Sequence, residues 1–440
     1  MNIRNIFLLL ALATLFACEP SLDEFTTSAG SADFSKYVSI GNSLTAGFAD
    51  GDVYLSGQLN SFPAILAYQM QAAGGGEFKQ PLMYDNYGFG NRLLLDASIP
   101  SPRPAGVTPD ERNFASVAGD GPFNNMGVPG AKSFHLVPGA EVYSNLNPYY
   151  RRFAAQPGVS TVLGEAMAQN ATFFTAWVGS NDVLAYAYEG GASDSITNPA
   201  LLQQAVTGIF GGMASNGAKG AVANIPYITD IPFFTFMNTK LPYYGLVLTE
   251  QAQADALNAG YAPLNAFIKS IGSTDTLAFN VGPNGFVIVD KDIPWGIRQM
   301  KEGDLFLLTL PTDSVKNYGY GSQTPIPDNY VLTTTEVTKI KNATDSYNLI
   351  IEGLATQLGL ALVDMNEHMN TLATTGITVD GITFTEDFIT GKAFSLDGIH
   401  LTAQGNAVVA NFFIDAINAK FGADLKHVSP RLYPGIYYFQ

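Results

Sequence analysis

The chain has 440 residues, of which 47% are hydrophobic and 14% are charged, and its formal net charge is −16. This composition is ample for a large buried core, organised as one elaborated domain or as two, while the negative charge disfavours nucleic acid as a partner. The single cysteine nearly excludes a metal site built from histidine and cysteine, and we expect no metal and no cofactor.

The N-terminus has the pattern of a secretory signal. A short start carrying Arg4 precedes an apolar run from Ile6 to Ala17, which is too short to span a bilayer, since spanning takes about 20 residues. The sole cysteine, Cys18, ends this run in a Leu-Phe-Ala-Cys sequence that resembles a bacterial lipobox. We therefore expect 1–18 to be a lipoprotein signal with lipidated Cys18, 19–35 to be a tether, and the protein to be anchored in the cell envelope, at the outer membrane. An ordinary signal peptide is the alternative.

The elements that follow alternate between strand and helix. Tyr37–Ile40 is a short apolar run typical of a buried strand, and a helical pattern runs from Asn60 to Gln71. Residues 76–121 are rich in Gly, Pro and Asp, which predicts either a binding loop or a poorly ordered segment. A short strand at Phe123–Met126 leads into a turn of strong breakers at 127–131.

The second half repeats this alternation. Strands are predicted at 172–178, 221–223 and 360–364, and helices at 159–168, 201–214, 248–271, 335–358 and 403–420. Residues 273–332 hold small strand-like pieces and interrupt the series as an insertion. Strands alternating with helices predict a parallel sheet with helices on both faces. We expect a three-layer α/β fold, flavodoxin-like, with one domain at 36–440 that carries insertions at about 76–121 and 273–332.

Four short motifs carry the residues suited to chemistry. They are Gly-Asn-Ser-Leu at 41–44, Asn125 with Gly127 to Gly130, Gly-Ser-Asn-Asp at 179–182, and Asp-Gly-Ile-His at 397–400. Three of them come directly after predicted strands, and ligands bind at the carboxyl ends of strands in open α/β sheets. Each motif is weak alone, and the set is specific.

Together these motifs resemble the SGNH (GDSL-type) hydrolase superfamily over residues 36–72, 122–232 and 333–420. The resemblance implies that Ser43 is the nucleophile, that His400 is the general base and then the acid, and that Asp397 holds the imidazole. It also implies an oxyanion hole made by the backbone N–H groups of Ser43 and Gly130 and by the side-chain amide of Asn181.

General chemistry supports these residue types. A serine hydroxyl needs a base to become a nucleophile, histidine titrates near neutrality, and a carboxylate fixes its tautomer. The sequence departs from the family at Asn42, where an acidic residue is usual. We expect a small effect, because asparagine can also accept and donate hydrogen bonds.

Other polar and aromatic residues are given structural interpretations. His135 is taken as a loop histidine that could line the pocket, His427 as solvated, and His368 as lacking a paired carboxylate at the same spacing. Asp182 is taken as structural. The aromatic side chains of Phe233, Phe234 and Phe236 are equally suited to flooring an acyl pocket and to packing.

The resemblance implies hydrolysis of lipid or short-chain esters through an acyl-serine intermediate. A carbohydrate O-acetyl esterase is the alternative within enzymes. A catalytically silent, surface-anchored binding protein is the alternative of another class. The insertion at 273–332, with Pro294 and Trp295, is expected to cover or flank the active-site edge and to select the substrate.

Overall fold

The computed structural model describes residues 27–96, 99–436 and 438–439. The predicted signal segment, Cys18 and the first part of the tether lie outside the described residues. A five-stranded sheet with strictly parallel pairing forms the centre of the molecule. Its order is β4 (Asn125–Gly127), β1 (Tyr37–Gly41), β5 (Phe173–Trp177), β6 (Lys219–Ala223) and β13 (Ala361–Val363).

The strand order is that of the flavodoxin-like fold. Numbered along the chain, these strands lie in the order 2-1-3-4-5, so the chain leaves β1 toward β4 on one side and continues with β5 on the other. Gly41 of β1 is level with both Gly127 of β4 and Trp177 of β5. The carboxyl ends of these strands therefore meet at one edge of the sheet, and the predicted three-layer α/β fold is confirmed.

Helices cover both faces of the sheet. On one face α4 (Phe62–Gln71) packs against α15 (Ala403–Phe421), and the Phe62 and Phe413 rings stack at 4.9 Å. On the other face lie α7 (Val162–Ala168), α9 (Pro199–Ala214) and α13 (Thr334–Leu358). The sheet residues are almost fully buried between these layers, as near-continuous apolar strands of a parallel sheet require.

Local sequence explains where the long helices begin. Thr333 and Glu336 form a capping box at the start of α13, and Thr402 accepts a hydrogen bond from Gly405 N–H at the start of α15. The predicted helices agree with α4, α7, α9, α11 (Gln251–Ser270), α13 and α15 to within a few residues. Among the described residues, no helix is both long and apolar enough to cross a membrane.

Several short elements were not predicted, because their apolar periodicity spans too few residues to register. The short helices are α2 (Ser43–Ala46), α3 (Leu55–Leu59), α5 (Tyr143–Leu146), α6 (Pro148–Phe153), α8 (Asn181–Ala187), α10 (Pro232–Lys240) and α14 (Met365–Thr374). The outlying strands are β2 (Leu93–Asp96), β3 (Ile99–Pro104), β14 (Ile377–Val379), β15 (Ile382–Phe384) and β16 (Tyr438–Phe439). Of these, α8 and α14 lie beside the site described below.

The carboxylates of Asp52 and Asp85 hold the segment 76–121 in place. Asp52, which is fully buried, accepts hydrogen bonds from Phe89 N–H and Asn91 N–H. Asp85 accepts from Asp110 N–H and from the Asn113 side chain. The segment is thus held by hydrogen bonds to these two carboxylates rather than by long secondary structure.

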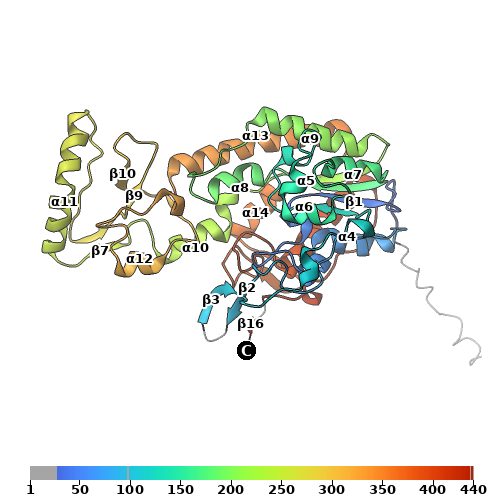
Figure 1. Ribbon diagram of the computed structural model, residues 1–440, viewed down its shortest axis with the longest axis horizontal. Coiled ribbons are helices and arrows are strands. Elements are labelled where there is room, and N and C mark those ends of the chain that lie inside the picture. Colours follow the sequence, from blue (N-terminus) through green and yellow to red (C-terminus); the bar gives the residue numbers. More distant parts are fainter. Residues whose placement is uncertain (1–26, 97–98, 437, 440) are drawn as a thin grey trace, which may run out of the picture.

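Residues 241–332 form a lobe that projects from the core (Figure 1). The lobe contains α11 and α12 (Thr312–Asn317) and the short strands β7 (Leu246–Leu248), β8 (Gly282–Asn284), β9 (Val287–Val289), β10 (Ile297–Gln299), β11 (Leu305–Phe306) and β12 (Val331–Leu332). Helix α11 packs on the lobe's own apolar cluster, with Ala254 and Ile268 beside Phe279. The insertion observed therefore begins before residue 273 and takes in the helix that precedes it.

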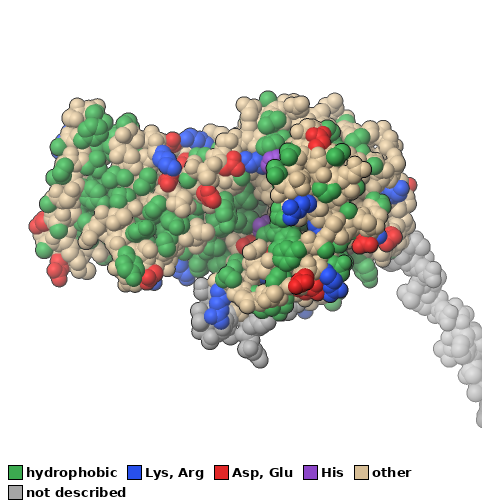
Figure 2. Space-filling view, viewed as in Figure 1, with side chains coloured by type: hydrophobic (Ala, Val, Ile, Leu, Met, Phe, Trp, Pro, Cys, Tyr) green, Lys and Arg blue, Asp and Glu red, His purple; other side chains and the backbone are tan. Residues whose placement is uncertain are grey.

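The lobe also exposes apolar side chains. Figure 2 shows hydrophobic side chains spread over its visible face. Those of Tyr244, Val247, Phe267, Ile271, Val281 and Tyr318 are substantially exposed.

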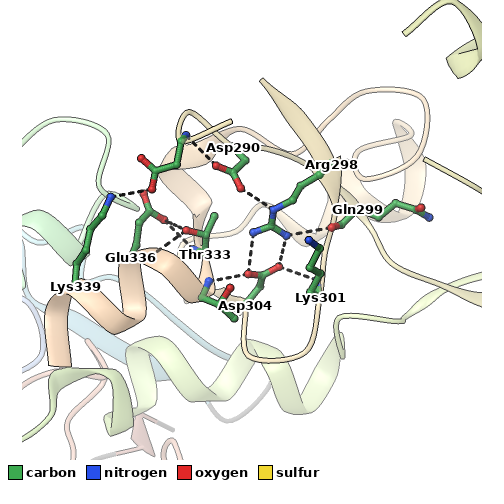
Figure 3. Close-up of polar contacts among 10 residues, drawn as sticks. Asp290, Arg298, Gln299, Lys301, Asp304, Thr333, Glu336 and Lys339 are labelled. Atoms are coloured by element: carbon green, nitrogen blue, oxygen red, sulfur yellow. Dashed lines mark hydrogen bonds and ion pairs between the residues drawn. The ribbon is translucent and has the colours of Figure 1, made fainter. Parts of the chain in front are cut away.

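A buried ion-pair cluster joins the lobe to α13 (Figure 3). The guanidinium of Arg298 donates to Asp290 at 2.6 Å and to both oxygens of Asp304 at 2.6 and 3.0 Å. Asp304 also accepts from Thr334 N–H, the first residue of α13, at 2.8 Å. Removing one partner from such a cluster leaves charge buried without compensation.

We expect Arg298→Ala to lower the free energy of unfolding of the lobe by about 3–5 kcal/mol, since two buried carboxylates lose their partner. The chain has two tryptophans, so in a Trp177→Phe background the fluorescence of Trp295 follows the lobe alone during urea unfolding. The control is Lys339→Ala, which breaks an exposed pair with Asp292 and should cost ~0–1 kcal/mol. Equal losses in the two variants would contradict the prediction.

Candidate active site

Ser43 lies at the carboxyl end of β1, on the turn into α2. The Asn42 side chain accepts a hydrogen bond from Leu44 N–H at 3.0 Å and so caps this short helix. A Cβ on Gly41 would lie 2.2 Å from the Thr45 hydroxyl, which explains the glycine there. Asn42 therefore supplies the acceptor that this turn needs.

His400 connects Ser43 to Asp397. Its Nε2 lies 2.8 Å from Ser43 Oγ, and its Nδ1 lies 2.9 Å from Asp397 Oδ2. The three side chains are mostly buried, with Ser43 6% exposed. The structure thus brings Ser43 to hydrogen-bond distance of His400, which lies 357 positions later in the sequence.

A tight turn aims the Asp397 carboxylate at His400. Asp397 Oδ1 accepts from Ile399 N–H at 2.9 Å and from His400 N–H at 2.8 Å, and Gly398 provides the left-handed φ of 71° that this turn uses. Burial acts to raise the pKa of Asp397, but the paired His400 and these hydrogen bonds outweigh it and hold the pKa well below its ordinary value. The carboxylate is therefore charged and orients the imidazole with a proton on Nδ1.

Two further contacts to Asp397 were missed at the sequence level. Gly51 N–H donates to Asp397 Oδ2 at 3.0 Å, and the Ser395 hydroxyl donates to Oδ1 at 3.2 Å. Ser395 in turn accepts from Asp50 N–H, and Asp50 accepts from Leu396 N–H. The spacing Ser395-x-Asp397 is a local signal that could have been noticed, whereas the contacts from Asp50 and Gly51 depend on the fold.

Two backbone N–H groups and one side-chain amide belong to residues that line the cleft beside the Ser43 hydroxyl. The N–H groups of Ser43 and Gly130 make no hydrogen bond within the described residues, and Gly130 adopts a left-handed φ of 76°. Asn181 Nδ2 donates one proton to Ala131 O at 2.9 Å, which leaves its second proton available. Ser43, Gly130 and Asn181 line the same cleft, an arrangement able to bind an oxyanion.

Asp182 fixes the loop that carries Gly130. Its carboxylate accepts from Ser133 N–H and from the Ser133 hydroxyl, both at 2.8 Å, and it is fully buried. Burial raises the pKa of Asp182 despite these hydrogen bonds. The residue links α8 to the loop 128–133, in agreement with the structural role expected for it.

The remaining histidines lie outside this hydrogen-bonded set. His135 stacks on Tyr143 at 4.2 Å and accepts from Lys132 N–H, and the exposed His427 pairs with Asp415. His368 stacks on Phe412 at 3.6 Å. Burial lowers the pKa of His368, so its ring is neutral at neutral pH.

The aromatic residues at the start of α10 serve in packing. Phe233 and Phe234 are buried in the core on one face of the sheet, and Phe236 packs against Phe388 at 4.9 Å. None of these three lines the hollows beside Ser43.

Two hollows meet at Ser43. One is a narrow, partly enclosed cavity of about 110 Å³ with an almost entirely apolar lining. The other is an open cleft of about 630 Å³ that includes Gly130, Tyr149, Tyr188 and Glu189. No residue of 76–121 or 273–332 lines either hollow. The insertion approaches only at its root, where Leu308 N–H donates to Phe233 O and Phe233 N–H donates to Gly398 O, so it flanks the site rather than covering it.

Comparison with known proteins gives matches among solved structures only. No family model and no curated protein matches the chain. An α/β hydrolase enzyme from the metagenome of Lake Arreo is 11% identical over 88% of this chain and 96% of that one, with a TM-score of 0.35. A lipase/acylhydrolase from Enterococcus faecalis is 11% identical over 89% and 99%, with a TM-score of 0.33. An acetyl-xylooligosaccharide esterase from Geobacillus is 10% identical over 88% and 96%, with a TM-score of 0.34. With likenesses this distant, the chemistry of the site is argued from its own geometry.

We expect Ser43 to react covalently with a fluorophosphonate probe, because His400 is placed to accept its proton and the free N–H groups are placed to bind the phosphonyl oxygen. Ser43→Ala should abolish labelling and His400→Ala should slow it strongly, as measured by gel fluorescence and by mass mapping of the labelled peptide. The control Ser116→Ala, at an exposed serine, should label like wild type. A label mapped to any serine other than Ser43 would contradict the prediction.

Proposed function

We propose that the chain is a carboxylic ester hydrolase of the SGNH (GDSL) type that works through an acyl-serine intermediate. The observation that carries the proposal is the continuous hydrogen-bonded line from Ser43 Oγ through His400 to Asp397, at 2.8 and 2.9 Å. Nucleophile, base and orienting carboxylate in hydrogen-bond reach are the parts that acyl transfer needs.

The reaction then runs in two halves. His400 Nε2 takes the Ser43 proton as Oγ attacks the ester carbonyl, and the negative charge on the carbonyl oxygen is met by Ser43 N–H, Gly130 N–H and Asn181 Nδ2. Collapse of this intermediate breaks the bond to the alkoxy oxygen, which receives the proton from His400 and leaves as the alcohol. A water molecule, deprotonated by His400, attacks the acyl-serine, and a second collapse releases the carboxylic acid and restores Ser43.

The intact set of side chains argues against the silent binding protein. A binding protein has no need of a buried, charged Asp397 that fixes an imidazole against a serine hydroxyl. The carbohydrate O-acetyl esterase uses the same site on a different substrate, and the shape of the two hollows bears on that choice below.

The anchoring of the protein is a separate part of the proposal and is supported by sequence alone. The position of Cys18 at the end of the apolar run supports a lipidated N-terminus in the cell envelope. We expect cells fed an alkyne-tagged fatty acid to label the wild-type protein, and Cys18→Ser to remove the label and release the protein from the membrane fraction. Undiminished labelling of Cys18→Ser would refute the anchor.

The hydrolase itself is tested by turnover of p-nitrophenyl butyrate. We expect Ser43→Ala and His400→Ala each to lower kcat by roughly 10⁴ or more, and Asp397→Asn to have an effect in the same direction, from the measured behaviour of serine triads. The double variant Ser43→Ala/His400→Ala should be no slower than the slower single variant, because the two residues act as one unit. A folded His400→Ala protein of near wild-type activity, with folding checked by circular dichroism, would refute the assignment.

A further inference from the structure

The apolar cavity beside Ser43 is lined mainly by residues of α14, β15 and α15. Its lining includes Met369 and Leu372 of α14, Phe384 of β15, and Val408 and Phe412 of α15. Met369, Leu372 and Phe384 are buried in the folded chain. The polar side chains in the lining, such as Asn42, Ser180 and Asn181, belong to the segments that hold the reacting groups. The lining also includes the neutral ring of His368, which stacks on Phe412. The lining offers hydrocarbon contacts and few partners for hydroxyl groups.

The open cleft has a different character. It shares Ser43, Asn181, Leu184, Ile399 and His400 with the cavity. Beyond these it presents the aromatic hydroxyl-bearing residues Tyr149 and Tyr188, together with Glu189 and Asp194. Asp194 is held by an ion pair to Lys132 at 2.8 Å. Water and polar groups can therefore enter this side of Ser43.

The reaction sequence distinguishes the two sides. The acyl group stays bonded to Ser43 after the alcohol leaves, so it can occupy the narrow apolar cavity throughout the intermediate. The alcohol must depart and a water molecule must arrive at the same carbonyl, and both need the open side. The shape thus assigns the acyl group to the cavity and the alcohol to the cleft.

We propose, on the basis of the function above, that the cavity is an acyl-chain site and that the substrates are esters of an aliphatic acid longer than acetate with a polar alcohol. An acetyl group would leave the cavity unfilled. Each further methylene buried there contributes a transfer free energy of about 0.8 kcal/mol, which corresponds to roughly a fourfold gain in kcat/KM.

The first test is a series of p-nitrophenyl esters from acetate to dodecanoate, in which only the acyl chain changes. We expect kcat/KM to rise by up to roughly fourfold per methylene until the cavity is full, and then to fall. A series that is highest at acetate would overturn the acyl site and favour the carbohydrate O-acetyl esterase.

The second test changes the cavity in opposite directions. Met369→Trp should move the preferred acyl chain to a shorter length, and Leu372→Ala should move it to a longer one. The matched control is Asn370→Trp, which is exposed on the same helix and should keep the wild-type chain-length profile. If Met369→Trp fails to fold, Leu372→Ala alone decides, and an unchanged profile in that variant would overturn the assignment.

The third test asks which side takes the alcohol. Tyr188→Ala, in the cleft, should change the ratio of kcat/KM for glyceryl octanoate and methyl octanoate while the acyl-length profile stays as in wild type. A shift of the acyl-length profile by Tyr188→Ala, with none by Leu372→Ala, would show the reverse orientation and refute the proposal.

The two proposals fail in distinguishable ways. If the wild-type protein hydrolyses no ester of the series and Ser43 takes no fluorophosphonate, both are overturned. If hydrolysis depends on Ser43 and His400 but kcat/KM is independent of acyl length, the hydrolase stands and the acyl site is overturned.

Discussion

The hydrogen bonds of the Asp397 carboxylate join the segment after β1 to the turn before α15, and so bring two distant parts of the chain into one site. The carboxylate accepts hydrogen bonds from the backbone N–H groups of Ile399 and His400 in its own turn, and a third from Gly51 N–H in the segment after β1. These donors compensate the burial of a charge that would otherwise be costly. Because they come from both loops, the same interaction that keeps Asp397 ionised also sets the position of His400 relative to Ser43.

The sheet order makes this convergence possible. With strands in the order 2-1-3-4-5, β4 and β5 lie on opposite sides of β1, and the loops after these three strands meet at one edge of the sheet. Ser43 follows β1, Gly130 follows β4 and Asn181 follows β5. Asp182 then ties the Gly130 loop to α8 through Ser133, so the backbone N–H group of Gly130 and the Asn181 amide share one support.

At this edge of the sheet, two hollows of different character meet at Ser43. Apolar side chains of α14, β15 and α15 enclose the cavity, whereas α8 and the loop after it border the open cleft. The lobe at 241–332 contributes to neither hollow. It is fixed to the start of α13 by Arg298 and Asp304, and near the site it contacts Phe233 and Gly398 through Leu308.

The sequence by itself determined the class of fold and the residues of the hydrogen-bonded line from Ser43 through His400 to Asp397. The pattern of apolar residues in long helices and buried strands can be recognised within a short window of sequence. Ser43, Asn181, Asp397 and His400 stand in short motifs with recognisable turns. The sequence also indicated a structural role for Asp182, whereas the cap that Asn42 places on α2 and the contact of Asp182 with Ser133 appear only in the folded chain.

Only the tertiary structure decided how these pieces act together. The contact of Gly51 with Asp397 joins residues that are 346 positions apart. The assignment of α11 to the lobe and the packing role of Phe233 and Phe234 likewise depend on which segments meet in space. The acyl cavity depends in the same way on α14 and β15, whose residues look like ordinary core positions along the chain. A hydrophobic residue carries the same sequence signal whether it fills a core or borders a cavity, because the difference lies in what packs against it.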